Sequence, residues 1–96
     1  MQKTKDIEQK LKKLKPRLSK DFSVEKIGYF GSYAENKQHS KSDLDIMVEF
    51  SSPIGWKFFT LEKFLEDQFG IKVDLVTPSA LKKQLQERIL RQIKFV

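Results

Sequence analysis

The chain has 96 residues, of which 39% are hydrophobic and 33% are charged, and it contains no cysteine. This leaves room for one globular domain over residues 1–96 and excludes disulfide frameworks, thiolate zinc sites and cysteine nucleophiles. The net charge of +6 divides into +6 over residues 1–20, −4 over 21–79 and +4 over 80–96. No apolar run reaches the ~20 residues that span a bilayer, and no secretory signal is recognisable. We therefore expect a cytoplasmic protein with no membrane partner.

The first expected element is a basic helical segment over residues 1–22, ahead of a core over 24–96. Apolar side chains recur at the spacing of one helical face, at Ile7, Leu11, Leu14 and Leu18. Thr4 is the expected N-cap. Pro16 should end or kink the helix near Lys15, because its ring lacks an amide hydrogen and clashes with the preceding turn. Leu18 and Phe22 would then continue on a second short helix.

Residues 26–50 predict two strands separated by a turn and a polar loop. The first strand covers residues 26–30, Gly31-Ser32 forms a tight turn, and residues 33–36 form one or two helical turns. After a loop at residues 37–42, apolar and polar side chains alternate from Asp43 to Phe50. This alternation indicates a half-buried strand.

The remainder of the chain predicts a helix, a strand and a last helix. Apolar residues at helical spacing run from Phe58 to Phe69, Gly70 closes that helix, and residues 71–76 form a strand. Thr77-Pro78 would open a helix that continues to Ile93. The alternation predicts an α/β (α+β) fold in which helices cover a small mixed sheet of three to four strands. Because so small a sheet leaves edges to cover, the chain could form a homo-oligomer.

Three aspartates break the local rules for strands. Asp43 and Asp45 lie two residues apart on an expected strand, so their carboxylates project from the same face. Asp74 interrupts an apolar strand, where aspartate is a poor strand former. If the two strands are neighbours, the three carboxylates converge, and the natural counter-charge is a hard divalent cation such as Mg²⁺. The sequence therefore predicts a magnesium site.

Gly31-Ser32 is the candidate seat for a phosphate group. Gly31 allows a ligand to approach the backbone closely. Ser32 would begin a short helix whose free amide hydrogens attract anions, and its hydroxyl adds a further donor. A phosphate cradle followed by a carboxylate metal site would line a single cleft.

These motifs together resemble the signature of the polymerase-beta-type nucleotidyltransferase superfamily. The resemblance rests on Gly31-Ser32, ten intervening residues, Asp43-Leu44-Asp45, and Asp74 on a later strand. The stretches YFGSYAEN, SDLDIMVEF and VDLVTPSAL are similar to the minimal nucleotidyltransferase (MNT) branch, known as the antitoxin half of HEPN/MNT toxin–antitoxin pairs. The resemblance covers residues 24–96 and implies the polymerase-beta-type nucleotidyltransferase fold.

The resemblance also implies a magnesium-dependent enzyme that transfers AMP from ATP to a hydroxyl acceptor. That acceptor would be a Tyr of a cognate HEPN ribonuclease toxin. By position, Gly31 and Ser32 would hold the triphosphate, and Asp43 and Asp45 would ligate two magnesium ions. Asp74 would ligate the ion nearer the acceptor and help to deprotonate its hydroxyl. The ions would stabilise the attacking and leaving oxygens.

The chain departs from the family in one place. Many members carry Arg-Gly where Glu35-Asn36 stand here. Asn tolerates the left-handed conformation of the glycine, but Glu35 removes a positive charge near the phosphates. An antitoxin that neutralises the toxin by contact, without catalysis, therefore stays an alternative. A basic nucleic-acid-binding module is a third hypothesis that only the charge supports, and nucleic acid is not expected as a direct partner.

Overall fold

The structure is a computed structural model that describes residues 3–39 and 41–96. Its elements are, in chain order, α1 (Thr4–Phe22), β1 (Val24–Phe30), β2 (Leu44–Phe50), α2 (Lys57–Phe69), β3 (Val73–Val76), a 3₁₀ turn (Pro78–Ala80), α3 (Lys83–Gln92) and β4 (Lys94–Phe95). No helix in these two described ranges is long and apolar enough to cross a membrane.

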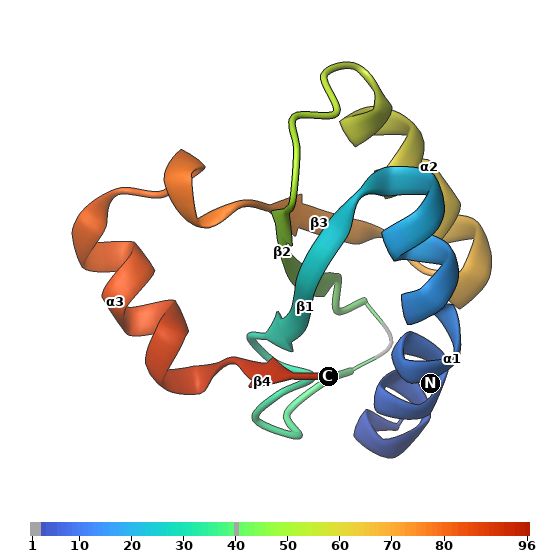
Figure 1. Ribbon diagram of the computed structural model, residues 1–96. Helices are drawn as coiled ribbons and strands as arrows, with labels where there is room; N and C mark the ends of the chain where they lie inside the picture. The colour runs from blue at the N-terminus through green and yellow to red at the C-terminus, as the bar shows by residue number, and fades with distance from the viewer. Residues whose placement is uncertain (1–2, 40) are drawn as a thin grey trace.

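The four strands form one mixed sheet in the order β3-β2-β1-β4. β1 runs antiparallel to β2 and to β4, whereas β3 runs parallel to β2. α1 and α2 lie together on one side of the sheet, and α3 stands on the other side (Figure 1). The predicted architecture, a small mixed sheet of three to four strands covered by helices, is confirmed, and β4 is the fourth strand.

The hydrophobic core lies between the sheet and the α1–α2 layer. Fully buried side chains come from both helices and from the two central strands: Ile7, Leu11, Leu18, Ile27, Ile46, Val48, Leu61 and Leu65. Burying each such side chain contributes about 1.5–3 kcal/mol. The hydroxyl of the buried Tyr29 donates a 2.6 Å hydrogen bond to Oε1 of Glu8. This bond joins α1 to β1, so the basic N-terminal helix shares the core of the sheet.

The sequence predicts that Pro16 ends or kinks the first helix near Lys15 and that a second short helix follows. The predicted break does not occur. α1 continues through Pro16 as one helix to Phe22. The missing amide removes one hydrogen bond, but Leu11 before the proline and Leu18 after it bury on the same face. Packing of an amphipathic face outweighs a local propensity penalty of this size.

Thr4 is not the N-cap of α1. It is the first helical residue, the cap position falls on Lys3, and no side chain caps the helix there. The Thr4 hydroxyl instead donates a 2.7 Å hydrogen bond to the carbonyl of Tyr33. The start of α1 is therefore attached to the turn that follows β1.

The expected helix from Thr77 to Ile93 is also wrong in part. The 3₁₀ turn ends at Ala80, Leu81 and Lys82 are extended, and α3 begins only at Lys83. Ile93 is extended as well, because the next two residues pair with Gly28 and Tyr29 of β1. Backbone pairing along the sheet edge thus replaces the last turn of the predicted helix.

The end predicted for α2 is confirmed. Gly70 follows the helix with a φ of +69°, and its amide donates to the Glu66 carbonyl at 2.8 Å. A residue with no side chain adopts this left-handed conformation without strain.

Candidate active site

The turn after β1 begins at Gly31, whose φ is +72°. The Glu35 amide donates to the Gly31 carbonyl at 3.1 Å, and the Lys37 amide donates to the Ser32 carbonyl at 2.8 Å. Residues 31–36 are a wide hydrogen-bonded turn, so the helix predicted at 33–36 does not form.

The reason lies in the first and last residues of the expected helix. Asn36 adopts a left-handed φ of +57°, as expected of the residue that replaces glycine here, and this conformation ends a right-handed helix. The Tyr33 carbonyl accepts its hydrogen bond from Thr4 of α1. Ser32 therefore stands in a turn rather than at a helix N-terminus.

Strand register aligns the predicted metal-binding residues across the sheet. Phe30, the last residue of β1, is the register partner of Asp45 on β2. Asp45 is in turn the register partner of Asp74 on β3. Asp43 lies one residue before β2 begins. The structure thus brings the three aspartates to the sheet end at which β1 turns into Gly31.

Gly31 lies directly against the carboxylate of Asp45. A Cβ atom built on Gly31 would overlap Oδ2 of Asp45. Glycine is required at this position for two reasons. Its φ is left-handed, and the neighbouring carboxylate occupies the space that a side chain would need. This contact is the closest link between the predicted phosphate cradle and the predicted metal site.

The carboxylates of the site repel one another. Burial, followed by the charges of Asp74 and Asp43, raises the pKa of the Asp45 carboxyl to about 6. Asp45 is partly buried, whereas Asp43 and Asp74 are exposed. The two salt bridges within residues 3–39 and 41–96 join Arg17 to Asp21 and Lys63 to Asp67, so neither neutralises the site.

The donor set suits a hard cation but does not by itself complete a metal site. In the part of the chain that the structure describes, no group of three His, Cys, Asp or Glu side chains is arranged to hold a metal ion. The three aspartates nonetheless offer only carboxylate oxygens, the ligands that Mg²⁺ prefers. Burial raises the pKa of Asp45 most, and the charges of Asp74 and Asp43 raise it further; a bound cation would offset this repulsion between the carboxylates.

A cleft of about 390 Å³ opens beside this cluster. One wall comes from the sheet and the turn, with Gly31, Glu35 and Asp74, and the other comes from α3 and the residues before it. α3 buries only Ile89 among its residues, so the helix leaves space between itself and the sheet. A volume of ~300–1,000 Å³ is typical of small-molecule sites.

The sequence did not reveal the α3 wall of the cleft. It is formed by Leu85, Arg88, Ile89 and Gln92 of α3, together with Leu81 before the helix. Apolar residues recur at helical spacing at Leu81, Leu85, Ile89 and Ile93, but a stripe that lines an open cleft has the same sequence pattern as one that packs into a core. The available signal was Arg88, a charged residue on that stripe.

The fold and the site place the chain in a known class of proteins. A match to the nucleotidyltransferase domain family spans residues 11–96. The chain belongs to this family, as the resemblance in its motifs predicts.

Individual relatives narrow the class. The chain is 50% identical over 78 residues to a candidate protein adenylyltransferase of Methanocaldococcus jannaschii, with 80% of each chain covered. It is 40% identical to protein adenylyltransferase MntA of Thermococcus cleftensis, covering 95% of this chain and 93% of that one. A solved toxin–antitoxin complex with AMP-PNP is 29% identical with a TM-score of 0.75, covering 92% of this chain and 70% of that chain.

Proposed function

We propose that the chain transfers AMP from ATP to a hydroxyl group of a partner protein and releases pyrophosphate. The observation that carries this proposal is the contact of Gly31 with Asp45, flanked by Asp43 and Asp74 at one end of the sheet. A phosphate held at Gly31-Ser32 would lie beside three carboxylates. The names of the two relatives, both protein adenylyltransferases, support the same reaction.

Each residue has a role in this proposal. Gly31 and Ser32 hold the triphosphate through their backbone amides and through the Ser32 hydroxyl. Asp74 accepts the proton of the acceptor hydroxyl, whose oxygen then attacks the α-phosphorus. The bond between the α-phosphorus and the bridging oxygen breaks, and pyrophosphate leaves. Asp43 and Asp45 would hold the Mg²⁺ ions whose positive charge balances the negative charge of the phosphates.

Two Mg²⁺ ions held by Asp43, Asp45 and Asp74 would supply electrostatic stabilisation of the attacking and leaving oxygens. Three exposed or partly buried carboxylates leave coordination positions for phosphate oxygens, which commonly complete magnesium sites. Because ATP is the substrate, the reaction belongs in the cytoplasm.

The proposed acceptor is a Tyr of a cognate HEPN ribonuclease toxin. The similar toxin–antitoxin complex, solved with AMP-PNP, supports a toxin partner and a nucleotide substrate. Modification of the Tyr would silence the toxin, which makes this chain its antitoxin. A homo-oligomer that covers the sheet edges is compatible with this role.

The test is the mass of the partner after reaction. The chain is incubated with ATP, Mg²⁺ and the HEPN protein encoded beside it, and intact mass spectrometry follows the partner. The proposal predicts additions of the mass of AMP, which vanish with Asp43→Asn. Asp67→Asn is the matched control, because Asp67 is an exposed aspartate on α2 that pairs with Lys63 away from the site. An unmodified partner under these conditions contradicts the proposal.

One observation favours a second candidate, an antitoxin that acts by contact alone. Glu35 lines the cleft beside Asp74, so it adds a negative charge where a nucleotide would bring its phosphates. This candidate predicts a tight complex with the toxin, no added mass, and neutralisation that survives Asp43→Asn.

A further inference from the structure

Arg88 is the one basic residue among the described residues that line the cleft. The helix α3 faces the cleft with Leu85, Arg88, Ile89 and Gln92, which are spaced at i, i+3, i+4 and i+7. Arg88 therefore stands on the inward stripe of the helix. Arg88 is also exposed, so its charged group stays in contact with solvent while the residue lines the cleft.

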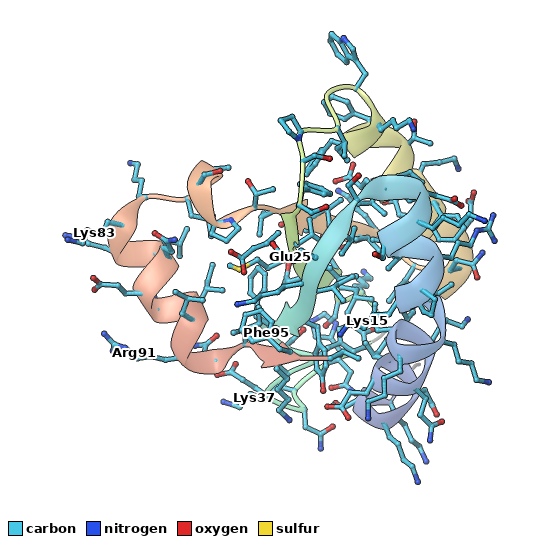
Figure 2. The ribbon with its side chains drawn as sticks, in the orientation of Figure 1. Lys15, Glu25, Lys37, Lys83, Arg91 and Phe95 are labelled. Carbon is cyan, nitrogen blue, oxygen red and sulfur yellow. The ribbon has the colours of Figure 1, made fainter. Side chains whose placement is uncertain are left out.

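The other basic side chains near α3 lie elsewhere. Lys83 and Arg91 project from the helix away from the sheet (Figure 2), and neither lines the cleft. The charge of +4 over residues 80–96 thus reaches the active site through Arg88 alone. Arg88 differs from the other basic residues of this segment in its position, because it lines the cleft.

The cleft around Arg88 is acidic. Glu35 and Asp74 line it on the opposite wall, and the carboxylate of Asp45 lies against Gly31. Within residues 3–39 and 41–96, Arg88 forms neither of the two ion pairs. Its guanidinium is therefore available to an anion that enters the cleft.

We propose that Arg88 binds the phosphate groups of the nucleotide and offsets the negative charge that Glu35 adds to the cleft. This inference rests on the proposed function. Guanidinium groups bind phosphate oxygens with two parallel hydrogen bonds, and they stay charged at every relevant pH. The phosphates would lie between the Gly31-Ser32 turn and α3, so that binding draws the loosely packed helix toward the sheet.

The test is the affinity of the chain for AMP-PNP in the presence of Mg²⁺, measured by isothermal titration calorimetry without a partner protein. Arg88→Ala should raise the dissociation constant about 10- to 100-fold, which corresponds to the loss of a hydrogen bond to a charged group. Arg88→Lys keeps the charge but loses the paired geometry, so we expect a smaller loss of about three- to tenfold. Arg91→Ala, one turn further along the same helix, should stay within about twofold of the wild type because Arg91 does not line the cleft.

A charge placed on the other wall provides a rescue. Glu35→Arg in the Arg88→Ala background should recover most of the lost affinity, because it returns a cation to the cleft from the turn. Glu35→Arg alone should tighten binding. Circular dichroism spectra of all variants should match the wild type, since Arg88 and Glu35 are both exposed.

The outcomes separate the two proposals. Equal affinities for Arg88→Ala and Arg91→Ala, with wild-type binding intact, overturn the role of Arg88 and leave the proposed function standing. Absence of AMP-PNP binding by the wild type overturns both. Weaker association of Arg88→Ala with the partner protein at unchanged nucleotide affinity would assign Arg88 to the partner interface and also overturn the inference.

Discussion

Replacing Asp45 with Asn should stabilise the metal-free protein at neutral pH and abolish AMP transfer. Burial and the charges of Asp74 and Asp43 raise the pKa of the Asp45 carboxyl to about 6, so the ionised group destabilises the folded chain. A rise from the ordinary value of ~3.9, at ~1.4 kcal/mol for each pH unit, corresponds to ~3 kcal/mol. Because Asp45 is only partly buried, solvent screening reduces this to about 1–2 kcal/mol.

The assay is thermal unfolding in EDTA at pH 7.5. For a chain of this size ~1 kcal/mol moves Tm by ~4–8 °C, so Asp45→Asn should melt about 5–15 °C above the wild type. Added Mg²⁺ should stabilise the wild type and leave Asp45→Asn unchanged, because the variant lacks a ligand. Asp67→Asn serves as the control for removal of an exposed carboxylate.

The effect should depend on pH in one direction. The folded chain binds the Asp45 proton more tightly than the unfolded chain does, so protonation stabilises the fold. This stabilisation is fully present below pH ~4 and is lost as the pH rises through about 6. The advantage of Asp45→Asn should therefore shrink on acidification. A variant that melts at or below the wild-type Tm at pH 7.5 would refute the electrostatic reasoning.

Three further substitutions have defined outcomes. Gly31→Ala should abolish AMP-PNP binding and lower the free energy of unfolding by at least ~1–2 kcal/mol in urea denaturation, because Ala is strained at this φ and its Cβ overlaps Asp45; an unchanged affinity would contradict the contact. Tyr29→Phe should cost ~1–2 kcal/mol in the same assay, since the hydrogen bond to Glu8 is lost, and little change would mean that the bond is not maintained in solution. Leu65→Ala should cost ~2–5 kcal/mol while leaving AMP-PNP affinity unchanged in the fraction that stays folded, because Leu65 is fully buried in the core.

The parts of the structure that follow from the sequence are those set by local pattern. Alternation over residues 43–50 and the turn residue Gly70 each have a single structural reading, and the structure agrees with both. The three aspartates were identifiable because each violates the composition expected of a strand. Their adjacency then required only that β2 and β3 be neighbours, which the parallel register of Asp45 and Asp74 satisfies.

The parts that the sequence did not predict depend on tertiary contacts. Pro16 is tolerated because the residues on both sides of it bury in one core. The segment around Ile93 leaves the helix because β1 offers an edge to pair with. Residues 33–36 end in the left-handed Asn36, and the Tyr33 carbonyl accepts a hydrogen bond from Thr4, which is distant in sequence. The cleft wall on α3 also depends on tertiary structure, because a helical stripe has the same sequence pattern whether it lines a cleft or packs into a core.

The central claim is that the cluster of Asp43, Asp45 and Asp74 beside Gly31 transfers a nucleoside monophosphate. It is tested most directly by following two forms of labelled ATP in the reaction with the partner toxin. ATP labelled at the α-phosphate should label the partner, ATP labelled at the γ-phosphate should not, and Asp74→Asn should remove the α-label. Label transferred from the γ-phosphate, or α-label that persists in Asp74→Asn, would contradict the account.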